Sequence, residues 1–244
     1  MRSLVMAVAL LLFGAAAQAG GRPVVVELFT SQGCSSCPAA DSFMEELART
    51  DGVVALTYPV DIWDYLGWAD TFARHEYSLR QQTYATNLPS RSVYTPQMVI
   101  GGIGDVVGSR RDDALAMIAA HAAKETPSAA ITLTAQDTAL RVEIAESQRL
   151  LGVEATVSVA RLASRLSADS AGGENAGRTV VYSNVVRELA PVGTWRGEAL
   201  RLEVPLAADV GAPFDRIAVI VQRNGQGPIL GGAIIDLART AAAA

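Results

Sequence analysis

A short apolar run, "VVVELF" at residues 24–29, constrains the fold of this chain more than any other segment. A nearly continuous run of this length is typical of a strand that is buried on both faces in the centre of an α/β sheet. Cys34 and Cys37 follow it, separated by two serines, and the apolar residues after them recur at helical spacing. Pro38 fits the first turn of that helix, where its missing N–H costs nothing. The sequence therefore predicts a buried strand, a two-cysteine loop and a helix in direct succession.

The first half of the chain alternates between strand and helix patterns. Residues 53–60 and the runs "QMVIGG" and "DVVGS" have strand patterns, and residues 68–85 and 110–125 have helix patterns, the last with Ser109 as its expected N-cap. A strand–helix–strand start gives a parallel pair of strands, and a later hairpin adds antiparallel strands. We therefore predict an α/β sandwich at 20–126, with a mixed sheet and flanking helices.

The second half of the chain contains almost only strand patterns. Turn residues separate them, including the stretch "SADSAGGENAG" and Gly193. The β-rich runs are "AAITLTAQ", "ALRVEIAE", "VEATVSVARL", "TVVYSNVV", "ALRLEVPL" and "RIAVIVQR". Short strands at this spacing favour a β-sandwich. We therefore predict an all-β, sandwich-like domain at 127–240.

The N-terminal residues have the pattern of a secretory signal peptide. Arg2 precedes the apolar stretch "LVMAVALLLFGAAA", and Ala17-Gln18-Ala19 offers the small residues of a cleavage site. The stretch is short for a membrane span and has no charged flank after it. We therefore predict a signal peptide at 1–19 and a periplasmic or secreted protein without a membrane span after cleavage.

Charge and cysteine content exclude several classes of function. The formal net charge is −5 and the chain has no basic run, so no surface for nucleic acid is predicted. Two cysteines in 244 residues are too few for a disulfide framework. The cysteine pair therefore indicates a site.

The position of the two cysteines favours redox chemistry. The first turn of a helix presents free N–H groups and the positive end of its dipole, which stabilise a thiolate. The pKa of Cys34, at the exposed N-terminal position, should therefore fall, making it the attacking thiol. Cys37, one turn along and more buried, would attack the mixed disulfide at Cys34 and release the partner. The reaction needs no cofactor, because the electrons come from a partner dithiol or disulfide.

A structural disulfide, a copper(I) site and a vestigial pair remain open as other interpretations, whereas a zinc site does not. A structural disulfide would close only a very small loop and so stabilise the fold little. A zinc site needs more ligands than the two cysteines, and His75 and His121 are the only histidines, so no such site is predicted. A linear copper(I) site for binding or delivery needs only the two thiolates. The pair would be vestigial if the chain is a non-enzymatic interaction protein.

Three motifs carry a resemblance to a known family. "VELFTSQGCSSCPAAD", "VDIWDYLGWADTFA" and "VYTPQMVIGG" together resemble the bacterial secreted family known as domain of unknown function 1223. The order of strand, cysteine pair, helix and a later Thr-Pro before a hairpin resembles the thioredoxin superfamily. The resemblance implies a thioredoxin-like fold and thiol–disulfide exchange on proteins outside the cytoplasm. It also implies that Pro96 is cis and that Thr95 and Pro96 offer their backbone to the substrate.

The sequence also departs from thioredoxin. Gly33 stands where thioredoxins have a tryptophan before the first cysteine, and the segment before Pro96 is long. These departures leave open whether the pair works as an oxidase, a reductase or an isomerase. The physiological substrate and electron partner are equally open.

Four further residues are candidates for the site. Glu27 interrupts the apolar strand, near where thioredoxins have a buried acid, and is the candidate proton acceptor for Cys37. A structural hydrogen bond is the alternative role. Asp61, Trp63 and Asp64 follow the second strand at the sheet edge where α/β proteins bind ligands, so they are candidate groove residues. An N-cap and a core tryptophan are the alternatives.

Four more polar residues stand out without a settled role. Asp41 lies one turn beyond Cys37, where favourable interaction with the helix dipole explains it. In the second half, Arg178, Asn184 and Arg187 would form a partner-binding face or a salt link at the interface of the two domains.

Overall fold

The fold is known from a computed structural model that describes residues 22–136, 138–170, 172–207 and 211–237. The predicted signal peptide at 1–19 lies outside the described residues. Within the described ranges, no helix is long and apolar enough to cross a membrane.

The described chain contains eleven strands, three α-helices and two short 3₁₀ helices. In chain order they are β1 (Val24–Thr30), α1 (Cys37–Leu47), β2 (Val53–Pro59), η1 (Asp64–Leu66), α2 (His75–Asn87), β3 (Gln97–Ile100), β4 (Gly104–Val107), α3 (Arg111–Ala122), β5 (Ile131–Ala135), β6 (Ala139–Ile144), η2 (Gln148–Leu150), β7 (Ala155–Ser170), β8 (Arg178–Trp195), β9 (Leu200–Pro205), β10 (Arg216–Arg223) and β11 (Ile229–Asp236).

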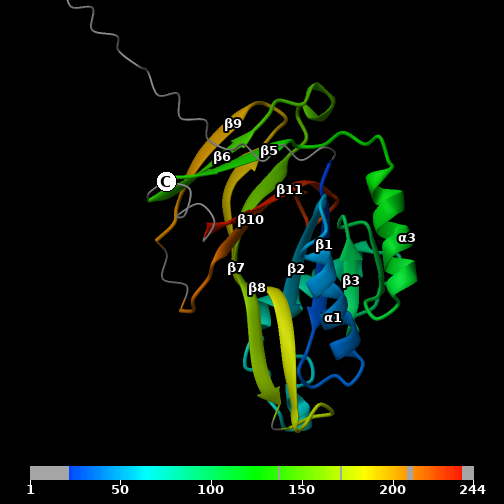
Figure 1. The fold of residues 1–244 in the computed structure, drawn as a ribbon. Coiled ribbons are helices and arrows are strands. Elements are labelled where there is room, and N and C mark those ends of the chain that lie inside the picture. The colour runs from blue at the N-terminus through cyan, green and yellow to red at the C-terminus, as the bar shows by residue number, and fades with distance from the viewer. Residues whose placement is uncertain (1–21, 137, 171, 208–210, 238–244) are drawn as a thin grey trace, which may run out of the picture.

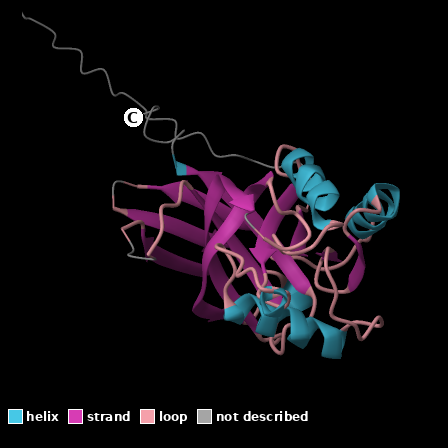
Figure 2. Ribbon diagram, turned by 90° about the horizontal axis from the view of Figure 1, so that it is seen from below, coloured by secondary structure: helices cyan, strands magenta, loops and turns pink. Residues whose placement is uncertain are grey.

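The strands form one large sheet and one small sheet (Figure 1). The large sheet has eight strands in the order β11-β10-β7-β8-β2-β1-β3-β4, and the small one has three in the order β5-β6-β9. The large sheet is mixed, because β1 pairs parallel to β2 and antiparallel to β3. The protein is therefore an α/β protein with a separate antiparallel three-stranded sheet. Figure 2 shows the three α-helices around one part of the strands, away from the strands at the left of that view.

The two halves of the sequence share the large sheet, which the sequence did not predict. Strands β7, β8, β10 and β11 extend the sheet of the first half, and only β5, β6 and β9 form the second sheet. The two sheets enclose a common core in which Leu140, Val142 and Trp195 are buried with residues of β7 and β10. Whether residues 20–126 and 127–240 are separate domains stays a prediction.

Strand β1 lies at the centre because both its faces are apolar. Val24, Val26 and Leu28 pack with the buried residues of α1 on one face of the sheet. Val25 and Phe29 pack on the other face with tyrosines from β2 and α2. The alternation of strand side chains thus separates the α1 face from the α2 face. This separation decides which polar side chains can reach the cysteines.

The junction between the halves depends on few backbone contacts. Strands β2 and β8 are joined by the single register pair Thr57–Val185. Side chains reinforce it: Thr57 Oγ1 donates to the carbonyl of Ser183 at 2.7 Å, and Asn184 Nδ2 donates to the carbonyl of Ala55 at 3.0 Å. Asn184 has a left-handed backbone with φ 50°. It therefore links the two halves, through hydrogen bonds rather than through the salt link that was one of its two predicted roles.

We expect Asn184→Ala to weaken this junction. The substitution removes a buried hydrogen bond and puts alanine in a left-handed conformation, so the free energy of unfolding should fall by about 2–4 kcal/mol. Asn184→Gly is the matched control, because glycine tolerates the backbone and loses only the side-chain bonds. Denaturant unfolding measures both. Equal stability of Asn184→Ala and the native chain would contradict this account of the junction.

Several predicted boundaries need correction. The helix predicted at 68–85 begins only at His75 and ends at Asn87, because Asp70 holds the preceding segment in a turn by accepting from the amide of Phe72. Ser109 is not the N-cap of α3; Arg110 is, and no side chain caps it. Gly193 lies within β8 rather than in a turn.

Strand β11 was not predicted because two glycines interrupt its β pattern. A Cβ on Gly231 would lie 2.2 Å from the carbonyl oxygen of Ala129, and one on Gly232 would lie 2.4 Å from a methyl of Val25. Close backbone approach therefore requires glycine at both positions.

Candidate active site

The two cysteines form a disulfide at the start of α1. Cys34 and Cys37 are bonded, and α1 begins at Cys37 with Pro38 in its first turn. The N-cap residue, Ser36, makes no side-chain capping bond, so its hydroxyl does not occupy the first-turn amides. Pro38 has no N–H, and the Cys37 amide donates to the carbonyl of Cys34 at 3.2 Å, so the positive end of the helix dipole is what would stabilise a thiolate.

Both cysteines are buried, which corrects the expectation for Cys34. Cys34 is 5% exposed and Cys37 is 0% exposed, whereas Ser35 and Ser36 between them are exposed. Cys34 Sγ lies 3.4 Å from Ser36 Oγ. The order of exposure agrees with attack by Cys34 and resolution by Cys37, but Cys34 presents only a small surface. The reason is a segment from the second half that packs on the cysteine loop.

That segment is residues 172–176, between β7 and β8, here called the hairpin tip. Asn175 Nδ2 donates to the carbonyls of Gln32 at 3.0 Å and Cys34 at 2.7 Å. Glu174 Oε2 accepts from the amide of Ser35 at 2.9 Å. The sequence predicted "GGENAG" only as a turn. Its contact with the cysteine loop could not be predicted, because the two segments are far apart along the chain.

The Thr95–Pro96 segment lies near the N-terminal part of α1. Its peptide bond is cis, as the resemblance implied. Pro96 and Ala40 of α1 both approach Gly108, where an added Cβ would lie 3.3 Å and 3.1 Å from their Cβ atoms. Pro96 therefore packs near the first turns of α1.

Trp63 connects the Thr95–Pro96 segment with the cysteine loop. Its Nε1 donates to Thr95 Oγ1 at 2.7 Å. A Cβ on Gly33 would lie 3.1 Å from Trp63 Cβ, so Trp63 packs directly on the residue before Cys34. The neighbouring Tyr65 is 76% exposed, and its ring centroid lies 6.2 Å from that of Trp63. Of the three predicted groove residues, Trp63 is the one that the structure brings beside the cysteine loop.

Asp61 and Asp64 hold the loop that carries Trp63. Asp61 accepts from Ser78 Oγ and lies 2.9 Å from His75 Nδ1. Burial raises the pKa of Asp61, but the bonds from Ser78 and His75 outweigh it and leave that pKa lowered. Asp64 Oδ1 accepts from the amide of Asp70 at 3.0 Å. Both carboxylates are therefore engaged in the structure of the 61–75 segment.

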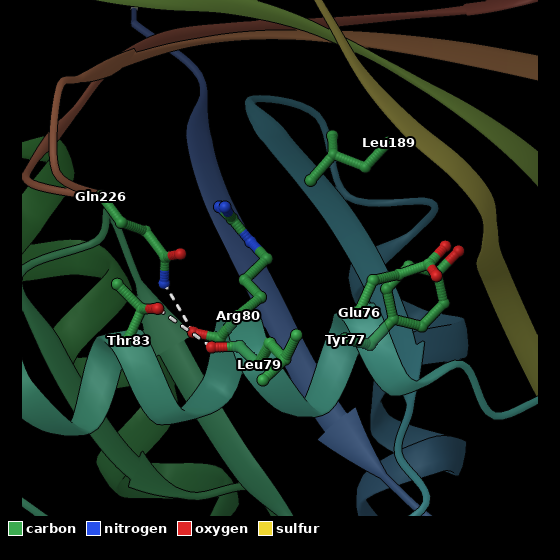
Figure 3. A pocket seen from close by; sticks show the side chains of 7 residues that line it. All are labelled: Glu76, Tyr77, Leu79, Arg80, Thr83, Leu189 and Gln226. Atoms are coloured by element: carbon green, nitrogen blue, oxygen red, sulfur yellow. Dashed lines mark hydrogen bonds between the residues drawn. The ribbon is translucent and has the colours of Figure 1, made fainter.

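Glu27 is not beneath Cys37, which corrects its predicted place. It is fully buried and receives two hydrogen bonds from Arg80, at 2.9 and 3.1 Å, and one from the hydroxyl of Tyr84. Figure 3 shows Arg80 extending from α2 toward the sheet. Glu27 shares its face of β1 with Val25 and Phe29, whereas α1 covers the opposite face. Glu27 therefore has the structural role given as the alternative.

Asp41 is the buried acid on the cysteine side of the sheet. It is 3% exposed, and its Oδ1 accepts from Thr30 Oγ1 at 2.8 Å. Cys37 and Asp41 are four residues apart on the buried face of α1, and side chains at this spacing are neighbours on a helix. Burial, more than the nearby Asp70, raises the pKa of Asp41 well above its usual range, despite the bond from Thr30.

The sequence offered one signal for Asp41, which was misjudged. An acid among Ala40, Phe43 and Met44 lies on the apolar face of the helix, so it had to be buried. Attraction to the helix dipole does not require burial.

Two buried polar residues, Tyr182 and Asp70, interact electrostatically with Asp41. Within the described chain, Asp41 Oδ2 and the hydroxyl of Tyr182 are buried without a hydrogen-bond partner. Burial chiefly raises the pKa of Tyr182, and the charges of Asp41 and Asp70 add to it. Asp70 Oδ2 accepts from the amide of Gln32 at 2.7 Å, just before the cysteine loop. Unsatisfied buried groups are rare, and groups with perturbed pKa values gather at functional sites, so Asp41 and Tyr182 are candidates for part of the site.

Other features of the surface lie apart from the cysteines. A shallow pocket of about 250 Å³ lies against α2 (Figure 3). Its lining contains none of the predicted site residues and consists of Glu76, Tyr77, Leu79, Arg80, Thr83, Leu189 and Gln226. The described ranges contain no group of three or more His, Cys, Asp or Glu side chains that could hold a metal ion.

Two solved structures have folds similar to that of this chain. Protein AGR_C_4864 from Agrobacterium tumefaciens is 27% identical, with a TM-score of 0.77 over 89% of this chain and 95% of that one. HBP35 of Porphyromonas gingivalis is 11% identical, with a TM-score of 0.62 over 90% of this chain and 76% of that one, so the likeness concerns the fold alone. No curated protein sequence matches the chain significantly.

The match to a protein family also covers both halves of the sequence. The model of the family described as "Protein of unknown function (DUF1223)" matches residues 25–222, which include the cysteine pair, Thr95–Pro96, the hairpin tip and the junction at Asn184. The chain belongs to this family.

Proposed function

We propose that this protein catalyses thiol–disulfide exchange on proteins outside the cytoplasm. The observation that carries the proposal is the Cys34–Cys37 disulfide at the uncapped N-terminus of α1. A cis Thr95–Pro96 bond near the same helix adds support, as does a buried acid one turn beyond Cys37. Together these features favour a thioredoxin-like assignment for the first half, with a sandwich-like second half. A periplasmic or secreted location rests on the predicted signal peptide.

The proposed reaction starts from the reduced pair. The Cys34 thiolate attacks a substrate disulfide, forms a mixed disulfide and releases one substrate thiolate. Cys37 then attacks Cys34 Sγ, which releases the second substrate thiolate and re-forms the Cys34–Cys37 disulfide. Two electrons pass from the pair to the substrate, and a partner dithiol restores the reduced pair. The reverse sequence oxidises a substrate dithiol.

Asp41 is the proposed proton acceptor for Cys37. Attack by Cys37 requires loss of its thiol proton, and Cys37 is fully buried from water. The carboxyl group of Asp41 has a raised pKa and one oxygen that no described residue occupies. An acid with these properties takes up the proton more readily near neutral pH than an exposed carboxylate does. Asp41 takes the place that the sequence gave to Glu27.

The proposed backbone contact to the substrate lies at Thr95. In the described chain, no hydrogen bond is recorded for the amide or carbonyl of Thr95, whereas the carbonyl of Pro96 accepts from Gly108 at 2.9 Å. Trp63 would form the neighbouring wall of the groove through its bond to Thr95. An extended substrate segment would then pair with Thr95 next to Cys34.

Redox equilibration tests the proposal. The purified protein should exchange electrons with glutathione and catalyse reduction or oxidation of a model protein disulfide, and both activities should disappear in Cys34→Ser. The equilibrium constant fixes the reduction potential, and therefore the direction that the pair favours. A pair that equilibrates with glutathione but does not accelerate exchange on any protein substrate would reduce the site to a structural disulfide.

A further inference from the structure

The hairpin tip makes contacts with the cysteine loop that simple packing does not require. It binds three backbone groups of the loop: the carbonyl of Gln32, the carbonyl of Cys34 and the amide of Ser35. The donor and acceptor of the tip are the adjacent residues Asn175 and Glu174. The backbone on both sides of Cys34 is therefore fixed by a segment about 140 residues away, as the separations of 139 and 141 positions show.

The shape of the tip fits this contact closely. Asn175 is fully buried although it lies in a connection between strands. Gly173 has φ 68°, and a Cβ there would lie 3.1 Å from Gly33 Cα, so a side chain at this position would be strained and crowded. A Cβ on Gly172 would lie 3.1 Å from Trp68 Cβ, and Trp68 Nε1 donates to Gln32 Oε1 at 3.0 Å. The hairpin tip and Trp68 thus both contact the cysteine loop and hold its backbone in place.

The charge of Glu174 acts on the same region as the helix dipole. The bond from Ser35 lowers the pKa of Glu174, so the exposed carboxylate is ionised at neutral pH. Ser35 directly follows Cys34 and precedes the N-cap of α1. A negative charge here opposes the positive helix end that stabilises a Cys34 thiolate. A less stable thiolate makes the disulfide harder to reduce, because reduction produces that thiolate.

We infer that the hairpin tip sets the redox equilibrium of the cysteine pair, with Asn175 positioning the loop and the Glu174 carboxylate disfavouring the Cys34 thiolate. This inference rests on the proposed exchange function and assigns part of the redox centre to the second half of the chain. The tip is also bonded to the backbone of Cys34, whose side chain is only 5% exposed, so it limits access to the thiol. The second half thus controls both the reduction potential of the cysteine pair and the access of other molecules to it.

Glu174→Gln tests the electrostatic part. It keeps the size and an acceptor oxygen but removes the charge. The acid dissociation constant of the Cys34 thiol, followed by thiolate absorbance of the reduced protein, should rise about threefold. At a pH above the midpoint of that titration, the equilibrium constant for reduction by glutathione should rise by the same factor, which is about 14 mV in potential. Reduction converts the disulfide and two glutathione thiols into the dithiol and glutathione disulfide.

A matched variant on the same hairpin is the control. Asp169 is exposed and accepts from Thr179 Oγ1 at 2.6 Å, so Asp169→Asn removes the same charge away from the cysteine loop. The other acids around the cysteines, Asp41 on α1 and Asp70 after β2, and Tyr182 on β8 are unchanged in both variants. The inference fails if Glu174→Gln leaves the thiolate titration and the potential unchanged, or if Asp169→Asn shifts them equally.

Asn175→Ala tests the positioning part. It removes both bonds to the loop carbonyls, so alkylation of reduced Cys34 should become faster at fixed pH as the loop loosens and exposes the thiol. Far-ultraviolet circular dichroism identifies any global unfolding, and Asn175→Leu repeats the loss of the donors at similar size without adding a charge. Unchanged alkylation in both folded variants would overturn the positioning role. These measurements use only the cysteine pair itself, so they test the role of the tip even if no protein substrate is turned over. A lack of turnover would reject the proposed function but not the role of the tip.

Discussion

A Cys37→Ser variant should accumulate mixed disulfides through Cys34 when it is exposed to extracytoplasmic proteins. Cys34 keeps the uncapped helix N-terminus that stabilises its thiolate, but the resolving attack from the first turn of α1 is lost. Multiple-turnover exchange should fall to the level without catalyst. The adducts are visible as reducible high-mass bands on non-reducing gels, and mass spectrometry identifies the attached proteins.

The matched controls separate this chemistry from nonspecific oxidation. Cys34→Ser retains only Cys37, which is fully buried, and should form few adducts. A variant without either cysteine sets the background. Adducts in equal yield from the two single variants would reject the assigned order of attack. Cys37→Ser without adducts above background would point instead to a structural disulfide.

Local patterns were sufficient to predict the elements around the cysteines. The apolar run at 24–29 forms β1, and the helical spacing after Cys37 forms α1. The cis bond at Thr95–Pro96 was implied by the family resemblance instead. The two elements depend on neighbouring residues, so a single sequence contains the information. The same holds for Trp63, which follows β2 directly and therefore reaches the edge of the sheet near the cysteines.

Features that depend on distant packing were not predictable in this way. The parallel contact between β2 and β8 cannot be inferred from either strand alone, so the shared sheet was missed. The hairpin tip reaches Cys34 only because β7 and β8 continue beyond the runs expected from their β propensity, to Ser170 and from Arg178. Glu27 was misplaced because a strand alternates its faces, and only the packing of α1 and α2 shows which face is which.

Asp41→Asn should slow the exchange while making the protein more stable near neutral pH. The asparagine keeps the acceptor for Thr30 but cannot take a proton from Cys37. Resolution of the mixed disulfide should slow by about 10²-fold, the lower end of the range for general acid–base catalysis. The attack of Cys34 on a substrate disulfide should change much less. Stopped-flow measurement of mixed-disulfide formation and decay separates the two steps.

The stability change follows from the direction of the pKa shift. The pKa of Asp41 is raised in the folded protein, chiefly by burial. Its contribution to stability is therefore complete below the unfolded pKa and is lost as the pH rises through the folded pKa, where a buried charge must form. Asparagine avoids this loss. The free energy of unfolding of the variant should therefore exceed that of the native chain by on the order of 1 kcal/mol or more at high pH. The difference should vanish in acid.

Glu46→Gln is the control for both effects. Glu46 lies on the same helix but is exposed and paired with Arg111, with oxygen–nitrogen distances of 2.7 and 2.8 Å. Its replacement should leave the resolving step unchanged and should not stabilise the protein at high pH. A combined loss of stability and resolution in Asp41→Asn would indicate that the carboxyl group is a structural element of the buried cluster. Slower resolution in a more stable protein is the result expected of a group held in an unfavourable environment for its chemistry.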